Sequence, residues 1–323
     1  MKISVVITTY NRTQDLDQCL NSLLIQILVP NEIIIIDNAS NDIAKSLIMS
    51  KKGDFLKEKC SLIYIRNKKN SLTAARNLGI KQTSGDIVIF LDDDVILSSD
   101  YVNEIYEVYK NYPEAIGVQG YIVPDCPHFR IRDFIHKIFY LYHLEHNDCR
   151  ALPSVSATYP IALNKVMKCQ WLSGANHSYR RRVFKEFKYD ENLIKYSEGE
   201  DLEFSHKIYS RYPGTLFITP FAILQHSASV SGRTLGKELI YMQEVYALYI
   251  FFKVFGTSSR NNRIYLWSRF GRIIIMIIQS IKHRSKEYFV DLRYLLEAYF
   301  LCIKKVRDIR EGNLEFFNKT LKS

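Results

Sequence analysis

Three consecutive carboxylates, Asp92, Asp93 and Asp94, are the residues of this chain that point most directly to chemistry. They follow an apolar run, residues 87–91, that is rich in β-branched and aromatic side chains. Adjacent carboxylates repel one another unless a cation or a tightly held donor compensates them. Hard divalent cations such as Mg²⁺ or Mn²⁺ prefer oxygen ligands. The triplet therefore indicates a metal site, with a solvated acidic turn after an edge strand as the alternative.

The first hundred residues alternate between strand and helix patterns. Strands are expected over residues 3–9, 32–37, 61–65 and the run that ends at Asp92, and helices over about 13–27, 42–49 and 72–82, the first with Thr13 as its N-cap. These strands are too apolar for a sheet with one solvated face, which favours a parallel sheet with helices on both sides. We therefore predict an α/β, doubly wound fold with the acids at the carboxyl edge of its sheet, where ligands bind.

Several polar side chains are expected at that same edge. They follow three strands or begin a helix, and are Thr8, Tyr10, Arg12, Asp37, Asn38, Arg76, Asp92, Asp93 and Asp94. A carboxylate such as Asp37 can accept from a pyrimidine N–H or a ribose hydroxyl, while Arg12, Arg76 and a metal can meet a diphosphate. The sequence contains no Gly-rich phosphate loop of the usual patterns. It therefore predicts a nucleotide site of another kind.

Six short segments, in this order, resemble the family 2 glycosyltransferases, which have the GT-A fold. The segments are VVITTYNR at 5–12, EIIIIDNASND at 32–42, ARNLGI at 75–80, GD at 85–86 with FLDDD at 90–94, WLSGAN at 171–176 and EDLEF at 200–204. The resemblance covers roughly residues 1–230. It implies single-displacement transfer of a sugar from a nucleotide sugar, with inversion at the anomeric carbon.

The resemblance also implies roles for individual residues. Asp37 would hold the nucleotide base, and Asp92 and Asp94 would serve ribose, sugar and a divalent cation, Mn²⁺ or Mg²⁺, with Asp93 assisting. Asp201 would be the catalytic base, with Glu200 beside it to contact or orient the acceptor. Glu200 and Asp201 also fit the acidic first turn of a helix, and both interpretations can hold together.

Other candidates lie in the second part of the resemblance. Trp171, Gly174, Ala175 and Asn176 are interpreted as the acceptor side, with a core role for Trp171 as the alternative. His226 follows an expected strand at 216–224 and is a third metal ligand or a buried histidine bonded to backbone. Arg233, in a Ser/Gly-rich stretch, is a candidate to close over the diphosphate.

A group of histidines and cysteines invites a zinc interpretation. It comprises Cys126, His128, His136, His143, His146 and Cys149. The spacings match no standard zinc site. Phe134, Ile138, Leu141 and Tyr142 interleave with the histidines, and we therefore expect an amphipathic helix here.

Composition narrows the classes of protein. The chain has 323 residues, a net charge of +10 and a pI of about 9.1. Six cysteines without a CxxC pair indicate neither a zinc ribbon nor a disulfide framework, and favour the cytoplasm. We expect no signal peptide and no transmembrane segment, because charged residues interrupt the apolar stretches 239–256 and 264–281. A nucleic-acid partner is not expected, since no binding module is recognisable.

We predict a GT-A domain over residues 1–234, with a nucleotide-sugar half (1–120) and an acceptor half (121–234), and a basic amphipathic helical region over 235–323. Residues 260–310 hold twelve Lys or Arg and four Asp or Glu. Such helices either pack on the catalytic domain or make peripheral contact with an anionic membrane at its inner face.

The expected function is transfer from a UDP- or dTDP-sugar to a saccharide or lipid-linked saccharide, in bacterial surface polysaccharide synthesis such as O-antigen or capsule. The alternatives are an inactive nucleotide-sugar-binding or scaffold protein and a sugar nucleotidyltransferase. The oligomeric state is left open.

Overall fold

The computed structural model describes residues 1–39, 41–123, 131–196, 198–227, 235–283 and 286–322. It divides into two compact units. Unit 1 comprises Met1–Pro127, Ala162–Glu191 and Phe204–Arg233, and unit 2 comprises His128–Ile161, Asn192–Glu203 and Thr234–Ser323. The domain division after residue 234 remains a prediction.

Unit 1 is built on a nine-stranded mixed sheet of order β10-β12-β6-β11-β4-β1-β2-β3, with β5 paired to β12. Strands β1 (Ile3–Thr9), β2 (Glu32–Asp37), β3 (Ser61–Arg66) and β4 (Ile87–Asp92) are parallel neighbours. The remaining strands are β5 (Val95–Leu97), β6 (Gly117–Ile122), β10 (Met167–Cys169), β11 (Asn176–Arg180) and β12 (Leu216–His226). The expected α/β fold and its first four strands are confirmed.

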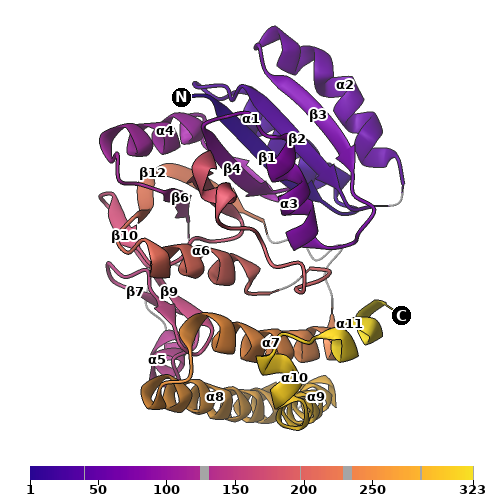
Figure 1. Ribbon diagram of the computed structural model, residues 1–323, viewed down its shortest axis with the longest axis vertical. Coiled ribbons are helices and arrows are strands. Elements are labelled where there is room, and N and C mark those ends of the chain that lie inside the picture. The colour runs from indigo at the N-terminus through magenta and orange to yellow at the C-terminus, as the bar shows by residue number, and fades with distance from the viewer. Residues whose placement is uncertain (40, 124–130, 197, 228–234, 284–285, 323) are drawn as a thin grey trace. The chain divides into compact units, whose positions relative to one another are not determined.

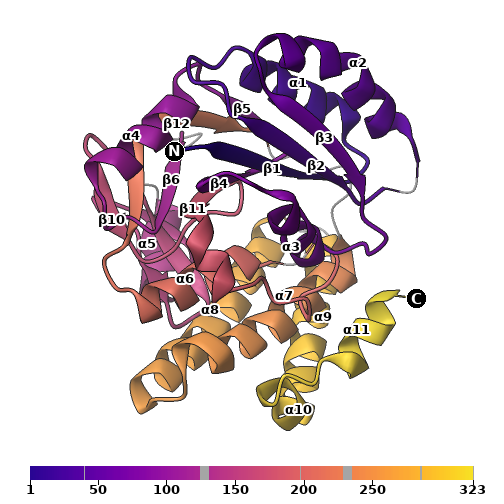
Figure 2. The same cartoon turned by 45° about the horizontal axis from the view of Figure 1, so that its top comes forward.

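Helices cover both faces of this sheet (Figure 2). One face packs against α1 (Thr13–Leu24), α2 (Ile43–Lys57) and α4 (Tyr101–Asn111). The other face packs against α3 (Leu72–Gln82). Strands buried on both sides need apolar residues at consecutive positions, which is why β2 reads as an unbroken isoleucine run.

Several details of the sequence prediction are wrong. Helix α1 ends at Leu24 rather than near residue 27, and α2 continues to Lys57 rather than ending near residue 49. Thr13 is the first residue of α1, and the N-cap is Arg12. The Arg12 side chain makes no capping hydrogen bond. The amphipathic helix around the histidines, α5, covers only Ile131–Ile138, since Tyr140 takes a positive φ of 52° that no helix continues. His143 therefore lies in a strand, β7 (His143–Glu145), while Cys126 and His128 lie outside the described residues.

Unit 2 is mainly helical. Its helices are α5, α7 (Gly236–Ile250) with a π-helical turn at Phe251–Phe255, α8 (Ser259–His283), α9 (Lys286–Lys304), α10 (Val306–Arg310) and α11 (Glu315–Lys322). A small sheet joins β7, β8 (Ala151–Leu152) and β9 (Ser156–Pro160). Figure 1 shows α8 and α9 packed on the same side of α7. The expected change to helices after residue 235 is confirmed.

Two helical glycines provide a matched test of the packing. A Cβ at Gly79 of α3 would lie 2.4 Å from Val6 Cγ1 of β1, whereas a Cβ at Gly53 of α2 would meet nothing within 4 Å. We expect Gly79→Ala to lower the free energy of unfolding by about 1–3 kcal/mol through overpacking. We expect Gly53→Ala to raise it by about 0.4–1 kcal/mol, since alanine restricts the unfolded chain. Urea unfolding of both variants measures the difference, and a Gly79→Ala protein as stable as the wild type would contradict the close packing.

Candidate functional site

The parallel strands of unit 1 bring their last residues to one edge. Thr9 lies opposite Asp37, Thr8 lies opposite Asp92, and Asp37 lies opposite Arg66. The residues expected at this edge from β1, β2 and β4 are therefore assembled as the sequence predicts. Tyr10, half-buried, follows β1 directly, before the left-handed residue Asn11 turns the chain into α1.

The acidic triplet lies at the end of β4 and in the turn to β5. Thr9 Oγ1 donates to Asp93 Oδ2 at 2.7 Å, and one Arg12 nitrogen donates to Asp93 Oδ1 at 3.1 Å and to Asp94 Oδ2 at 3.2 Å. Burial raises the pKa of Asp93 to about 7, although Arg12 and Thr9 act to lower it. Asp93 is thus held inside the protein, and its contacts fit a supporting role.

Asp92, Asp94 and His226 form a cluster that could hold a metal ion, with one candidate ligand atom from each residue and all three atoms within 4.8 Å of one another. The antiparallel pairing of β5 with β12 sets His226 opposite Val95, which places the imidazole beside Asp94, with Nε2 3.0 Å from Oδ1. Two carboxylates and an imidazole suit Mn²⁺. The donor set therefore fits a divalent cation.

Arg76 connects this cluster to the segment Ala162–Glu191 of unit 1. Its guanidinium is 2% exposed and donates to the Gly174 carbonyl at 3.0 Å and to Asp92 Oδ1 at 3.4 Å. Its guanidinium carbon also lies 5.4 Å from the centre of the Tyr189 ring. Burial raises the pKa of Asp92, and the Arg76 charge opposes that shift. Arg76 thus holds one acid in place.

Asp37 is fully buried and both of its oxygens accept hydrogen bonds. Oδ1 accepts from the Ala39 amide and Oδ2 from the Tyr64 hydroxyl, both at 2.8 Å, and Arg66 Nε lies 3.5 Å from Oδ2. Asn38 is half-buried, and its Oδ1 accepts from Asn67 at 2.7 Å. Sequence reasoning missed Tyr64, Arg66 and Asn67, although the parallel pairing of β3 with β2 implies that they share this edge.

The segment 171–176 is largely buried in unit 1. Asn176 Oδ1 accepts from the Gly120 amide at 2.7 Å and from the Tyr101 hydroxyl at 3.2 Å, so its side chain joins β11, β6 and α4. Trp171 is 7% exposed, and Ala175 4% exposed. These contacts are structural. Contact between the segment and an acceptor stays a prediction.

Glu200 and Asp201 form the first turn of α6 (Glu200–Arg211), and Leu202, Phe204 and Ile208 are buried. The expected helix is confirmed. Gly199 precedes it with a φ of +87°, a conformation that favours glycine. Asp201 is half-buried, and its Oδ1 accepts from the next amide at 2.7 Å. Both acids belong to unit 2. Arg233 lies outside the described residues.

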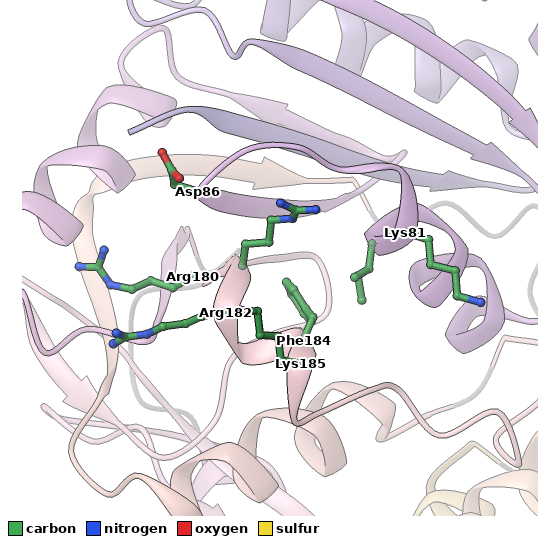
Figure 3. A pocket seen from close by; sticks show the side chains of 8 residues that line it. Lys81, Asp86, Arg180, Arg182, Phe184 and Lys185 are labelled. Carbon is green, nitrogen blue, oxygen red and sulfur yellow. The ribbon is translucent and has the colours of Figure 1, made fainter.

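A basic cavity of about 570 Å³ lies at another place in unit 1 (Figure 3). Its lining residues are Ile80, Lys81, Asp86, Arg180, Arg181, Arg182, Phe184 and Lys185. Arg180 pairs with Ile87, the first residue of β4, so the cavity is at the opposite end of that strand from Asp92. This cavity is therefore separate from the acidic site.

Comparison with known proteins gives one family. Residues 4–187 match the model of Glycosyl transferase family 2. Among curated proteins, a glucosyl-dolichyl phosphate glucuronosyltransferase from Haloferax volcanii is 25% identical over 196 residues, which are 59% of this chain. The chain spans 57% of the length of that relative, and 28% of the length of glycosyltransferase GlyA from Streptococcus pneumoniae.

Solved structures share the fold. Residues 1–349 of Staphylococcus aureus TarS, in complex with UDP-GlcNAc, superpose with a TM-score of 0.58 at 14% identity, covering 98% of this chain and 89% of that chain. The mannosyltransferase PcManGT from Pyrobaculum calidifontis, in complex with GDP-Man and Mn²⁺, gives a TM-score of 0.57 at 13% identity, covering 93% and 86%. The fold is therefore the GT-A fold that the resemblance implied.

Removing the imidazole tests the cluster. We expect His226→Ala to weaken Mn²⁺ binding by about tenfold or more, because a nitrogen ligand is lost while both carboxylates remain. Titration calorimetry of the full chain with Mn²⁺ measures the change. The control is His146→Ala, at an exposed histidine of unit 2. Equal Mn²⁺ affinity in the two variants would count against His226 as a ligand.

Proposed function

Because the chain belongs to glycosyl transferase family 2, we propose that it moves a sugar from a nucleotide sugar to a hydroxyl of a saccharide or lipid-linked saccharide, with inversion. The observation that carries this proposal is the cluster of Asp92, Asp94 and His226 at the carboxyl edge of the sheet. Ligands of open α/β sheets bind at this edge. Two relatives of the same fold were solved with nucleotide sugars, which supports the same class of donor here.

A divalent cation held by Asp92, Asp94 and His226 would stabilise charge on the departing diphosphate. Arg12 and Arg76 act on the donor through the acids that they hold, since their guanidiniums already bind Asp93, Asp94 and Asp92. The two fixed positive charges also oppose the rise in pKa that burial causes at Asp92 and Asp93, and hold the acids in position before the donor arrives.

The nucleoside is proposed to lie beside Asp37. Asp37, at the end of β2, offers carboxylate oxygens that accept hydrogen bonds, and Tyr64, on the neighbouring β3, offers a hydroxyl. A pyrimidine N–H can replace one of the donors to Asp37, and we propose uridine or thymidine as the base that makes this contact. Thr8, Tyr10 and Asn38 complete the walls of this proposed subsite.

Asp201 is proposed as the catalytic base. It takes the proton from the acceptor hydroxyl while that oxygen attacks the anomeric carbon, and the bond from this carbon to the diphosphate oxygen breaks. The nucleoside diphosphate leaves on the opposite face, so the configuration inverts. A base on the first turn of a helix is held by a rigid element, which this step requires. Glu200, beside it, is proposed to orient the acceptor, with Trp171, Gly174 and Ala175.

The acceptor is proposed to be a lipid-linked saccharide of a bacterial surface polysaccharide, at the cytoplasmic face of the membrane. The Haloferax volcanii relative, by its name, acts on a glucosyl-dolichyl phosphate, a sugar on a lipid carrier. The two alternatives are less well supported. An inactive scaffold would have no need for an assembled acidic cluster, and a nucleotidyltransferase would need a Gly-rich loop that the sequence lacks.

Donor binding can be measured without knowing the acceptor. We expect a UDP- or dTDP-sugar with Mn²⁺ to raise the melting temperature of the full chain, because a ligand of the folded state stabilises it by mass action. The same sugar without metal, and a GDP-sugar with metal, should give smaller shifts. A larger shift with the GDP-sugar would contradict the proposed base contact, and no shift with any donor would contradict the proposed site.

The base is tested by Asp201→Asn, which keeps the shape of the side chain and removes its basicity. We expect transfer to fall by about 10²–10⁴-fold while donor affinity stays the same. Donor turnover with an accepted acceptor and calorimetry with the donor measure the two properties. Asp54→Asn, at an exposed aspartate paired with Lys57 on α2, is the control. Turnover near that of the control would exclude Asp201 as the base.

A further inference from the structure

The helices of unit 2 expose many large apolar side chains. The apolar face, as we define it, consists of Phe134, Ile138, Leu266, Trp267, Phe270, Ile277, Ile278, Ile281, Phe289, Leu296, Phe300 and Ile303, from α5, α8 and α9. Monomeric proteins seldom expose contiguous apolar patches beyond roughly 300–600 Å². A set of this size indicates a surface that meets another apolar phase or molecule.

On α8 the exposed side chains occupy one side of the helix. Leu266, Phe270, Ile277 and Ile281 recur at steps of four, seven and four residues, which keeps them on a single stripe. From residue 264 to 281 the charged residues are Arg269 and Arg272 alone. Both form ion pairs with the buried Glu244 of α7. The outward side of α8 is therefore free of charge over this stretch.

The interior contacts of these arginines decide how α8 can meet a membrane. Arg269 Nη1 lies 2.9 Å from one oxygen of Glu244 on α7, and Arg272 Nη1 lies 3.1 Å from the other. Arg269 also donates to the Ser154 carbonyl at 2.9 Å, and Glu244 is 1% exposed. By length and composition α8 could cross a bilayer, and no other helix of the described residues meets that criterion. Crossing would break these ion pairs and bring two guanidiniums into hydrocarbon. Lying along the surface keeps them intact.

The neighbouring helices extend the stripe of α8. The Tyr299 hydroxyl of α9 donates to the Arg269 carbonyl at 3.1 Å, which joins α9 to α8. Phe289, Leu296, Phe300 and Ile303 are exposed on the side of α9 away from its buried residues Leu295, Ala298 and Cys302. The Trp267 indole donates to the Ile138 carbonyl at 2.8 Å, so the exposed end of α5 continues from α8.

Basic residues accompany these apolar side chains. Exposed cations lie near both ends of α8, at both ends of α9 and on α10, namely Arg260, Arg263, Lys282, Lys286, Lys304 and Arg307. Aromatic and aliphatic side chains with cations at their border are typical of helices in the headgroup region of a membrane. Each cation near such a surface is attracted by anionic lipid.

We propose that the apolar face docks in the interface of a bilayer that carries anionic lipid, with α8 and α9 along the surface and no helix crossing it. This proposal deepens the proposed function. It rests on that function only in taking the acceptor to be lipid-linked. A second copy of the chain fits less well, because a two-fold contact sets each surface against itself and would bring the basic borders together. The enzyme and a lipid-linked acceptor would then diffuse on the same membrane surface.

Vesicle flotation of the full chain tests the proposal. We expect binding to vesicles of equimolar phosphatidylcholine and phosphatidylglycerol, and weak binding to phosphatidylcholine alone. The double variant Phe270→Ser with Phe300→Ser should lose about tenfold or more in affinity, since two rings no longer enter the apolar layer. In the double variant Lys286→Gln with Lys304→Gln, the preference for the anionic vesicles over the phosphatidylcholine vesicles should be smaller, because two cations attracted by anionic lipid are removed.

The matched control places the same kind of change on unit 1. Ile27→Ser with Leu56→Ser removes two side chains that are 75% and 70% exposed, and should bind vesicles as the wild type does. No binding to either vesicle, or equal loss in the control, would overturn the proposal. Sedimentation equilibrium that shows a dimer lost in Phe270→Ser with Phe300→Ser would assign the face to a second copy instead. Donor calorimetry on the same variants separates this result from the transferase proposal, because none of the substituted residues belongs to the acidic site.

Discussion

The compensation of three adjacent carboxylates is the constraint on which unit 1 depends. β4 ends with Asp92, and the turn that follows carries Asp93 and Asp94 into a buried place. Burial raises the pKa of Asp92 and of Asp93, and positive charges nearby oppose that rise. Arg12 from the first strand–helix turn and Arg76 from α3 supply the positive charges. The order of elements around β4 therefore serves an electrostatic purpose as well as a packing one.

Hydrogen bonds of Arg76 and His177 join separate segments around the site. Arg76 binds a carboxylate and the Gly174 carbonyl at once, so the acid of β4 and the segment before β11 share one guanidinium. His177, on β11, is held by the Ser173 carbonyl and the Tyr189 hydroxyl, and its burial lowers its pKa well below the usual range. A neutral imidazole here adds no further charge to the region.

Sequence reasoning predicted the fold of unit 1 well because its signals are local. The isoleucine run of β2 and the apolar run of β4 each define a strand without help from distant residues. The contacts of Asp37 with Tyr64 and Arg66 were missed, since they depend on which strand lies beside β2. The interior partner of Arg269 and Arg272 was missed for the same reason: Glu244 is on another helix. Whether an arginine interrupts an apolar helix or anchors it cannot be told from spacing alone.

The register of β12 has a consequence for the choice of metal. His226 meets Asp94 only because it pairs with Val95, and the pairing of β12 with β6 shifts between Ile218 and Ile223. A slip of one residue would bring Gln225 or Ser227 to that position and exchange the proposed nitrogen ligand for an oxygen one. Oxygen-only sites suit Mg²⁺ or Ca²⁺, whereas an imidazole draws softer ions. In the proposed metal site, ion preference would thus depend on strand alignment, and one insertion or deletion in β12 would change it with every acidic residue left in place.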